Sequence, residues 1–226
     1  MSIKDILIND RSVSEFSHAF HSELAEIITL LEETETVFEN NFILRDNHRC
    51  KYVQEFTFMA IESVVSATRL LIEGHVNSSG NTMRIAYESL CMAILLSSDC
   101  SIVINKGKSP KTINFYKSYL EKHGKTKPYL AVDHVINNAE VLGLNSGKCW
   151  LKGAKEFYNT YSHSSLISMG SLILSSGNSI VGGGYHEEKI KLYTDNLEFI
   201  ARFLRQLPCL VEAIGNRNLT KQSTRC

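Results

Sequence analysis

The chain has 226 residues, of which 43% are hydrophobic and 21% are charged, and its formal net charge at pH 7 is zero. Thirteen glycines and three prolines are too few for a disordered or loop-dominated chain, and the composition is ordinary for a globular protein. A chain of this length can bury a substantial core, so we expect one domain over residues 1–226.

The sequence also bears on the compartment in which the protein is expected. The N-terminus carries acidic residues and no long apolar run, so it is not expected to be a secretory signal. No stretch is apolar for long enough to predict a membrane span. The six cysteines are scattered without a C-x-x-C pair, which disfavours a zinc site and favours a reducing compartment. We therefore expect a cytoplasmic protein with no metal, no cofactor and no membrane contact.

The first part of the chain shows apolar periodicity that predicts three helices. Apolar residues recur every three or four positions from Val13 to Phe38, which predicts one long helix capped by Ser12 or Ser14. A second apolar stripe predicts a helix from near Asp46 to Gly74. Residues 78–81 then form a short link to a third helix, so the second and third helices should be antiparallel neighbours.

The third helix, over residues 82–96, is apolar or small on every face except for Arg84 and Glu88, which predicts a helix buried on all sides. A buried charge needs a partner, and these two residues lie one turn apart, so they are expected to contact each other. Two interpretations stay open. The pair either fixes the packing of the helices, or Arg84 anchors a phosphate or carboxylate while Glu88 orients the guanidinium.

Charge is distributed unevenly along the neutral chain. Residues 12–44 contain seven glutamates and no lysine or arginine, whereas residues 101–127 contain seven lysines against Glu121 alone. This asymmetry predicts that the two segments dock, within the monomer or across a dimer, unless both are simply solvated faces. We expect a homodimer or a complex with a protein partner.

Residues 101–143 are predicted to form a small basic helical insertion in a bundle of longer helices. Residues 106–110 form a loop, residues 111–123 a short helix, and a second helix runs from Pro128 to Leu142, where Gly143 ends it. The segment combines lysines with Phe115, Tyr116, Tyr119 and Tyr129, a composition typical of nucleic-acid contact through Lys117, Lys122 and Lys125. Alternatively, aromatic residues at this spacing face a core.

The last part of the chain is also mainly helical. A helix begins near Gly147 and runs into the apolar residues 165–181, which either continue as helix or form a hairpin. Residues 182–184 are three glycines and break the chain. A final long helix begins at Ile190 and is bent or interrupted by Pro208. With no internal repeat and no sustained alternation, the fold is predicted to be all-α, a bundle of long antiparallel helices.

Polar residues gather where the helix that begins near Gly147 ends. Tyr158 and Ser162 lie one turn apart on one face, as do Asn159 and His163. His163 is the strongest candidate for a general base, because histidine titrates near neutrality. Tyr158 and Ser162 would then contact a substrate. The alternative is a histidine with a structural role.

An Arg84-x-x-x-Glu88 pattern on a central apolar helix, followed later by Tyr158, Ser162 and His163, resembles uncharacterised bacterial families near the HEPN-like superfamily. The resemblance implies a helical bundle that dimerises and acts on RNA, as a metal-independent ribonuclease of a toxin, CRISPR-associated or anti-phage defence system. It implies that His163 is the acid–base residue and that Arg84 binds phosphate.

The ribonuclease motif of that superfamily, R-x4–6-H, fits Arg69-x5-His75 and Arg11-x6-His18 by count, whereas no arginine precedes His163 at this spacing. The alternative function is a non-catalytic protein–protein interaction or regulatory module of such a system. In that case Arg84 and Glu88 are structural.

Overall fold

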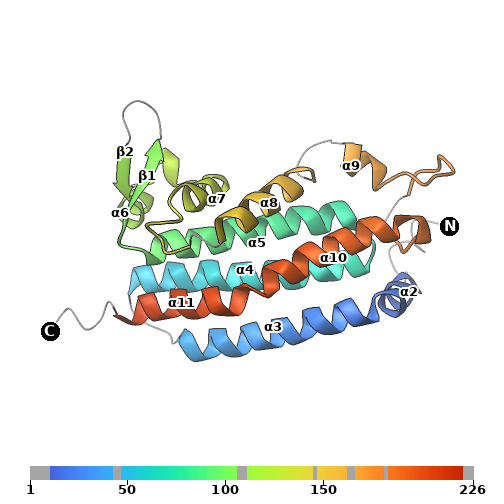
Figure 1. Cartoon of the computed structure of the whole chain (residues 1–226), viewed down its shortest axis with the longest axis horizontal. Helices are drawn as coiled ribbons and strands as arrows, with labels where there is room; N and C mark the ends of the chain where they lie inside the picture. The colour runs from blue at the N-terminus through green and yellow to red at the C-terminus, as the bar shows by residue number, and fades with distance from the viewer. Residues whose placement is uncertain are drawn as a thin grey trace.

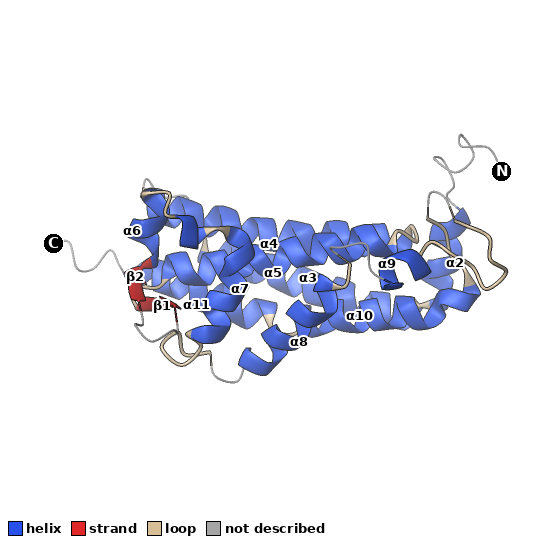
Figure 2. Ribbon diagram, turned by 90° about the horizontal axis from the view of Figure 1, so that it is seen from above, coloured by secondary structure: helices blue, strands red, loops and turns tan. Residues whose placement is uncertain are grey.

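The computed structural model describes residues 11–42, 47–105, 111–144, 147–161, 166–180 and 183–220, and the all-α prediction is confirmed. The long helices α3 (His21–Asn41), α4 (His48–Ile72), α5 (Val76–Ser97), α10 (Ile190–Leu204) and α11 (Leu207–Thr220) run along the long axis of the molecule (Figures 1 and 2). The helices α7 (Pro128–Asn137) and α8 (Lys148–Asn159) lie on the side of α5 that faces away from α3 (Figure 1).

The helices α4 and α5 are antiparallel neighbours, as predicted, but the turn between them lies earlier than expected. Residues 78–81 belong to the first turns of α5, and the chain reverses at Gly74, whose φ of +83° is left-handed. The Gly184 amide donates to the Glu73 carbonyl at 2.9 Å, so a distant loop closes over this turn. A glycine in the left-handed conformation is a common helix end, and here it also leaves room for a second backbone.

The far end of α5 is held by Arg49 of α4. Its guanidinium donates to the Leu96 carbonyl at 2.6 Å, to the Ser98 carbonyl at 2.7 Å and to Asp99 at 2.5 Å. The same group lies 4.9 Å from the centre of the Tyr116 ring. Carbonyls at a helix C-terminus lack intrahelical partners, so Arg49 supplies donors that the end of α5 needs.

The single first helix predicted from Val13 is wrong, because α2 (Arg11–Ala19) and α3 are separated at Phe20. Phe16 and Phe20 are both buried, and their ring centres lie 5.2 and 6.1 Å from that of Tyr193 on α10. The predicted cap is also wrong. Ser12 lies inside α2 and accepts a hydrogen bond from the Tyr185 amide at 2.6 Å. Packing against α10 and the loop before it therefore sets this break.

Residues 101–143 do not begin with a helix, which corrects the predicted helical insertion. An antiparallel hairpin of β1 (Ser101–Asn105) and β2 (Lys111–Asn114) comes first, and a short α6 (Phe115–Leu120) follows. Asn138, just after α7, pairs with β1 through both side-chain atoms: its amide donates to the Val103 carbonyl and its oxygen accepts from the Val103 amide. The predicted loop 106–110 lies outside the described residues.

Helix α3, which carries most of the glutamates of residues 12–44, and the described part of the lysine-rich residues 101–127 lie on opposite sides of the bundle (Figure 1). The predicted docking of the two segments within the monomer is therefore wrong. The helices α10 and α11 cover α3 instead, and Arg205 pairs with Glu26 at 2.6 Å. These last two helices are interrupted at residues 205–206, just before Pro208, as predicted. Residues 166–180 form a short α9 (Leu166–Gly170) and then a tight turn with an isolated bridge between Ile173 and Ser179, so the described part of this segment is neither one continuous helix nor a hairpin of two strands.

Candidate functional site

Arg84 and Glu88 contact each other on α5, as predicted, with 2.9 Å between Arg84 Nε and Glu88 Oε1. The prediction that α5 is buried on all sides is wrong. The side chains of Arg84 and Glu88 remain 34% and 17% exposed, and Ile85 between them is also exposed. The pair is therefore partly desolvated, and solvent or a ligand can still reach it.

A pocket of about 330 Å³ opens beside this pair, between α5, α7 and α8. Its walls carry a mixture of charged, aromatic and small side chains from the three helices: Arg84, Tyr87 and Glu88 of α5, Tyr129 and Val132 of α7, and Ala154, Lys155, Tyr158 and Asn159 of α8. Pockets that bind small ligands start at about this volume and hold a few polar groups in a largely apolar wall.

The pocket offers cationic donors that are held in place. Glu88 occupies the Nε side of Arg84, and the two terminal nitrogens of this guanidinium have no hydrogen-bond partner among the residues that the structure describes. Lys155 is positioned from the other wall by Asp133 of α7, with 2.6 Å between Nζ and Oδ1. A guanidinium with a free edge binds phosphate or carboxylate oxygens in a forked geometry.

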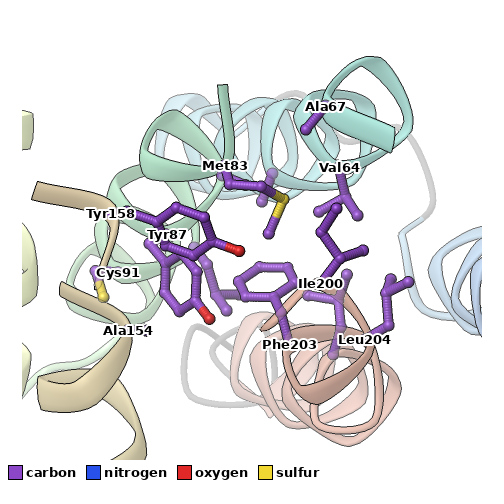
Figure 3. Packing of buried hydrophobic residues seen from close by; sticks show 14 of the residues in the cluster. Val64, Ala67, Met83, Tyr87, Cys91, Ala154, Tyr158, Ile200, Phe203 and Leu204 are labelled. Atoms are coloured by element: carbon purple, nitrogen blue, oxygen red, sulfur yellow. The ribbon is translucent and has the colours of Figure 1, made fainter. Parts of the chain in front are cut away.

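Two buried tyrosines form the inner wall of the pocket. The rings of Tyr87 and Tyr158 lie 5.4 Å apart, and Tyr87 continues into the core through Phe203 at 4.6 Å (Figure 3). Burial raises the pKa of both hydroxyls well above the ordinary value, so both stay protonated even at alkaline pH. Neither hydroxyl has a hydrogen-bond partner in the described part of the chain.

Replacing Tyr158 by phenylalanine is expected to leave the free energy of unfolding unchanged or to raise it by up to about 1 kcal/mol. The hydroxyl is buried without a partner, so its removal abolishes a desolvation cost and no hydrogen bond. Urea unfolding measures the change. The matched control is Tyr161→Phe, which removes the acceptor of Asn196 at 2.9 Å and should cost about 1 kcal/mol. A loss at Tyr158 as large as at Tyr161 would show that its hydroxyl has a partner.

The remaining predicted site residues fall in three places. Tyr158 lies in the pocket wall with its hydroxyl buried. Ser162 and His163 lie outside the described residues, but the chain just before them is tied to α5, since Asn81 donates to the Tyr161 carbonyl at 3.0 Å. Lys117, Lys122 and Lys125 are exposed on α6 and the residues after it, outside the pocket.

Most aromatic residues of the basic segment face the core. Phe115 is fully buried, and Tyr119 packs against Tyr52 of α4 with ring centres 5.6 Å apart. Tyr129 is the exception, because it is exposed and lies on the rim of the pocket two residues after Lys127. The lysine-rich residues are therefore followed closely in the chain by a residue of the pocket, and this residue, Tyr129, has an exposed ring.

The described side chains of the two R-x4–6-H matches do not line this pocket. Arg69 pairs with Glu73 on the surface of α4 at 3.2 Å, and His75 is the residue before α5 begins. The side chain of Arg11 lies outside the described residues. Lys155 was not predicted as a site residue, although its spacing on α8 indicates that it faces inward. It lies one turn after the buried Leu151 and one turn before Tyr158, on the inner side of α8.

No family model, curated protein or solved structure matches the chain. Among the described residues, no helix is both long and apolar enough to cross a membrane. In the same residues no group of three histidine, cysteine, aspartate or glutamate side chains is arranged to hold a metal ion. The assignment of function therefore depends on the chemistry of the pocket and its surroundings.

Proposed function

We propose that the protein binds RNA and that the pocket between α5, α7 and α8 receives one nucleotide of the strand. The observation that carries this proposal is the free edge of the Arg84 guanidinium in an open pocket of about 330 Å³. Glu88 orients this guanidinium toward a phosphate. Lys155 adds a second cation, and the exposed ring of Tyr129 stacks on a base at the rim.

The lysines of residues 101–127 guide the strand toward the pocket. Lys117, Lys122 and Lys125 are exposed, and the chain continues from them to Tyr129 on the rim. Cations on such a surface release counterions from the phosphate backbone when they bind it. Because most rings of this segment are packed in the core, base stacking along it is confined to Tyr129.

In this proposal the RNA is also cleaved, with His163 as the acid–base residue and no metal ion. Membership of the HEPN-like superfamily, and with it a role in a bacterial defence or toxin system, is supported by the resemblance of the sequence alone. Cleavage of a labelled RNA in EDTA by the wild type, and its loss in His163→Ala at unchanged stability, would support catalysis. Binding without cleavage by the wild type would identify a non-catalytic RNA-binding module.

Replacing Arg84 by alanine is expected to weaken RNA binding by tenfold or more and to lower the free energy of unfolding by about 1–2 kcal/mol. The stability loss stays below the 3–5 kcal/mol of a fully buried pair, because a third of the Arg84 side chain is exposed. Fluorescence anisotropy with a mixed-sequence single-stranded RNA measures the affinity, and urea unfolding measures the stability.

The matched control for this change is Arg69→Ala, which breaks another Arg-x-x-x-Glu pair on an exposed helix surface. It should leave both RNA affinity and stability nearly unchanged. Unchanged RNA affinity in Arg84→Ala would refute the proposed pocket. Loss of affinity in Arg69→Ala would move the site to the Arg69–His75 motif instead.

Replacing Lys117, Lys122 and Lys125 together by glutamate is expected to abolish RNA binding, and the wild-type affinity should fall steeply with salt concentration. The control with the same change of charge is Lys51, Lys152 and Lys191 to glutamate, since these exposed lysines pair within α4, α8 and α10. Gel shifts over a range of salt concentrations measure both variants. Equal loss in the two triple variants, or binding that is independent of salt, would rule out a guiding role for the basic segment.

A further inference from the structure

An apolar groove lies between α2, α3 and α4, on helices that do not line the Arg84 pocket. It encloses about 550 Å³ and is lined mainly by Val13, Leu31, Val65 and Ile72. Phe58, Val65 and Ile72 follow one another at seven-residue spacing along α4, so they lie on one face of that helix. The Phe58 ring lies 6.0 Å from that of Phe38 on α3, which continues the apolar surface toward the end of the groove.

This surface remains exposed to solvent to an unusual degree. Phe58 is 57% exposed and Val65 is 48% exposed, and Ile28, one turn before the groove residue Leu31 on α3, is also exposed. Single exposed apolar residues are normal, but a contiguous set on neighbouring helices marks an interaction surface. A partner that covers the set would have to present an apolar face of similar length.

Helical spacing places acidic residues of α3 and α4 beside the groove. On α3, a spacing of three or four residues places Glu32, Glu35 and Glu39 on the same face as Ile28. On α4, Glu62 lies one turn from both Phe58 and Val65. No described lysine or arginine forms an ion pair with these four carboxylates, whereas Arg69 at the groove's end is already paired with Glu73. The border is therefore net negative and selects a cationic partner.

We propose that this groove binds a basic amphipathic helix of a partner protein. An apolar stripe of the partner fills the space between α3 and α4, and its lysines or arginines face Glu32, Glu35 and Glu39. The apolar face of α4 that continues the groove spans about 21 Å of helix from Phe58 to Ile72, which fits roughly four turns of a partner helix. This site is independent of the proposed RNA site.

The charges of this chain argue against a second copy as the occupant. A twofold contact through the groove would bring two acidic borders together, which costs energy. The helices of the basic segment in another copy, α6 and α7, expose only Leu120 and Tyr129 among their large apolar residues, which is too few for an apolar stripe of this length. Phe115 is fully buried, and Tyr119 packs against α4 within its own chain. A partner helix that is both basic and apolar avoids both difficulties.

The test uses a labelled synthetic helix of about 18 residues built from leucine and lysine in an amphipathic pattern, and a peptide with glutamate in place of lysine. Anisotropy should show saturable 1:1 binding of the lysine peptide that weakens with salt, and at least tenfold weaker binding of the glutamate peptide. Val65→Glu should weaken binding of the lysine peptide by at least tenfold. The matched control is Val141→Glu, because Val141 is 54% exposed far from the groove, and it should have no effect.

A second variant, with Glu32, Glu35 and Glu39 changed to glutamine, should weaken binding of the lysine peptide without affecting the apolar lining.

Absence of saturable binding, equal binding of the two peptides, or equal binding by Val65→Glu and wild type would overturn the proposal. Sedimentation that shows a wild-type dimer dispersed by Val65→Glu would replace the partner helix by a second copy. Binding that appears only after removal of residues 1–10 would assign the groove to the chain's own N-terminus. RNA binding should be unaffected by these variants.

Discussion

Replacing Gly74 by alanine is expected to lower the free energy of unfolding by about 3 kcal/mol. The residue has a φ of +83°, a conformation that costs other residues roughly 1–2 kcal/mol. In addition, a Cβ at this position would lie 2.3 Å from the backbone N and O atoms of Gly184, and backbone cannot rotate away as a side chain can. Overpacking of this kind typically costs a further 1–3 kcal/mol, about as much as the conformational strain.

Urea unfolding of Gly74→Ala and of Gly143→Ala separates the two contributions. Gly143 also has a positive φ, of +69°, but nothing lies within 4 Å of its Cβ position. Its replacement should therefore cost only about 1 kcal/mol. Equal losses in the two variants would show that the close approach of Gly184 to the α4–α5 turn contributes nothing.

Replacing Arg49 by alanine is expected to cost a similar amount, about 3 kcal/mol. The change removes charged hydrogen bonds to two carbonyls at the end of α5 and one to Asp99, and hydrogen bonds to charged groups contribute about 1.5–3 kcal/mol each without being additive. The carbonyls of Leu96 and Ser98 would lose their donor in a partly buried position. Arg49→Lys should recover only part of the loss, because lysine lacks the planar fork.

Arg69→Ala is the control for Arg49→Ala, since its ion pair with Glu73 lies on the surface and should contribute less than about 0.5 kcal/mol. Chemical unfolding of the three variants measures the differences. If Arg49→Ala were as mild as Arg69→Ala, the end of α5 would be held by something other than this guanidinium. The near-ultraviolet circular dichroism of Arg49→Ala should also change, because Tyr116 loses its cationic neighbour.

The helix that carries the candidate site could be predicted because its sequence is so unusual. An apolar helix with only two charges one turn apart is visible without any structure, and the Arg84–Glu88 contact follows from helical geometry. The position of α7 and α8 across α5 depends on packing between residues far apart in the chain. The sequence therefore did not reveal that the pair opens on a pocket, or that Lys155 shares it.

The errors in the predicted elements have similar causes. The break at Phe20 carries no glycine or proline. The apolar spacing passes through it because Phe16 of α2 and Phe20 at the break are both buried against Tyr193. The hairpin strands are too short to show alternation, and only Ile102 of β1 is fully buried. Asn138 pairs with Val103 across 35 residues of sequence, a contact that no local pattern announces.

The covering of α3 by α10 and α11 has a consequence for how the chain is made. The helices α4 and α5 are consecutive, so they can pair as soon as both have left the ribosome. In contrast, Glu26 meets Arg205, which follows α10, only after 179 further residues have been added, and Phe16 of α2 packs against Tyr193 of α10. During synthesis, the apolar side of α3 therefore stays exposed to solvent until almost the whole chain has been made. This exposed apolar surface makes α3 the segment that a chaperone is most expected to bind.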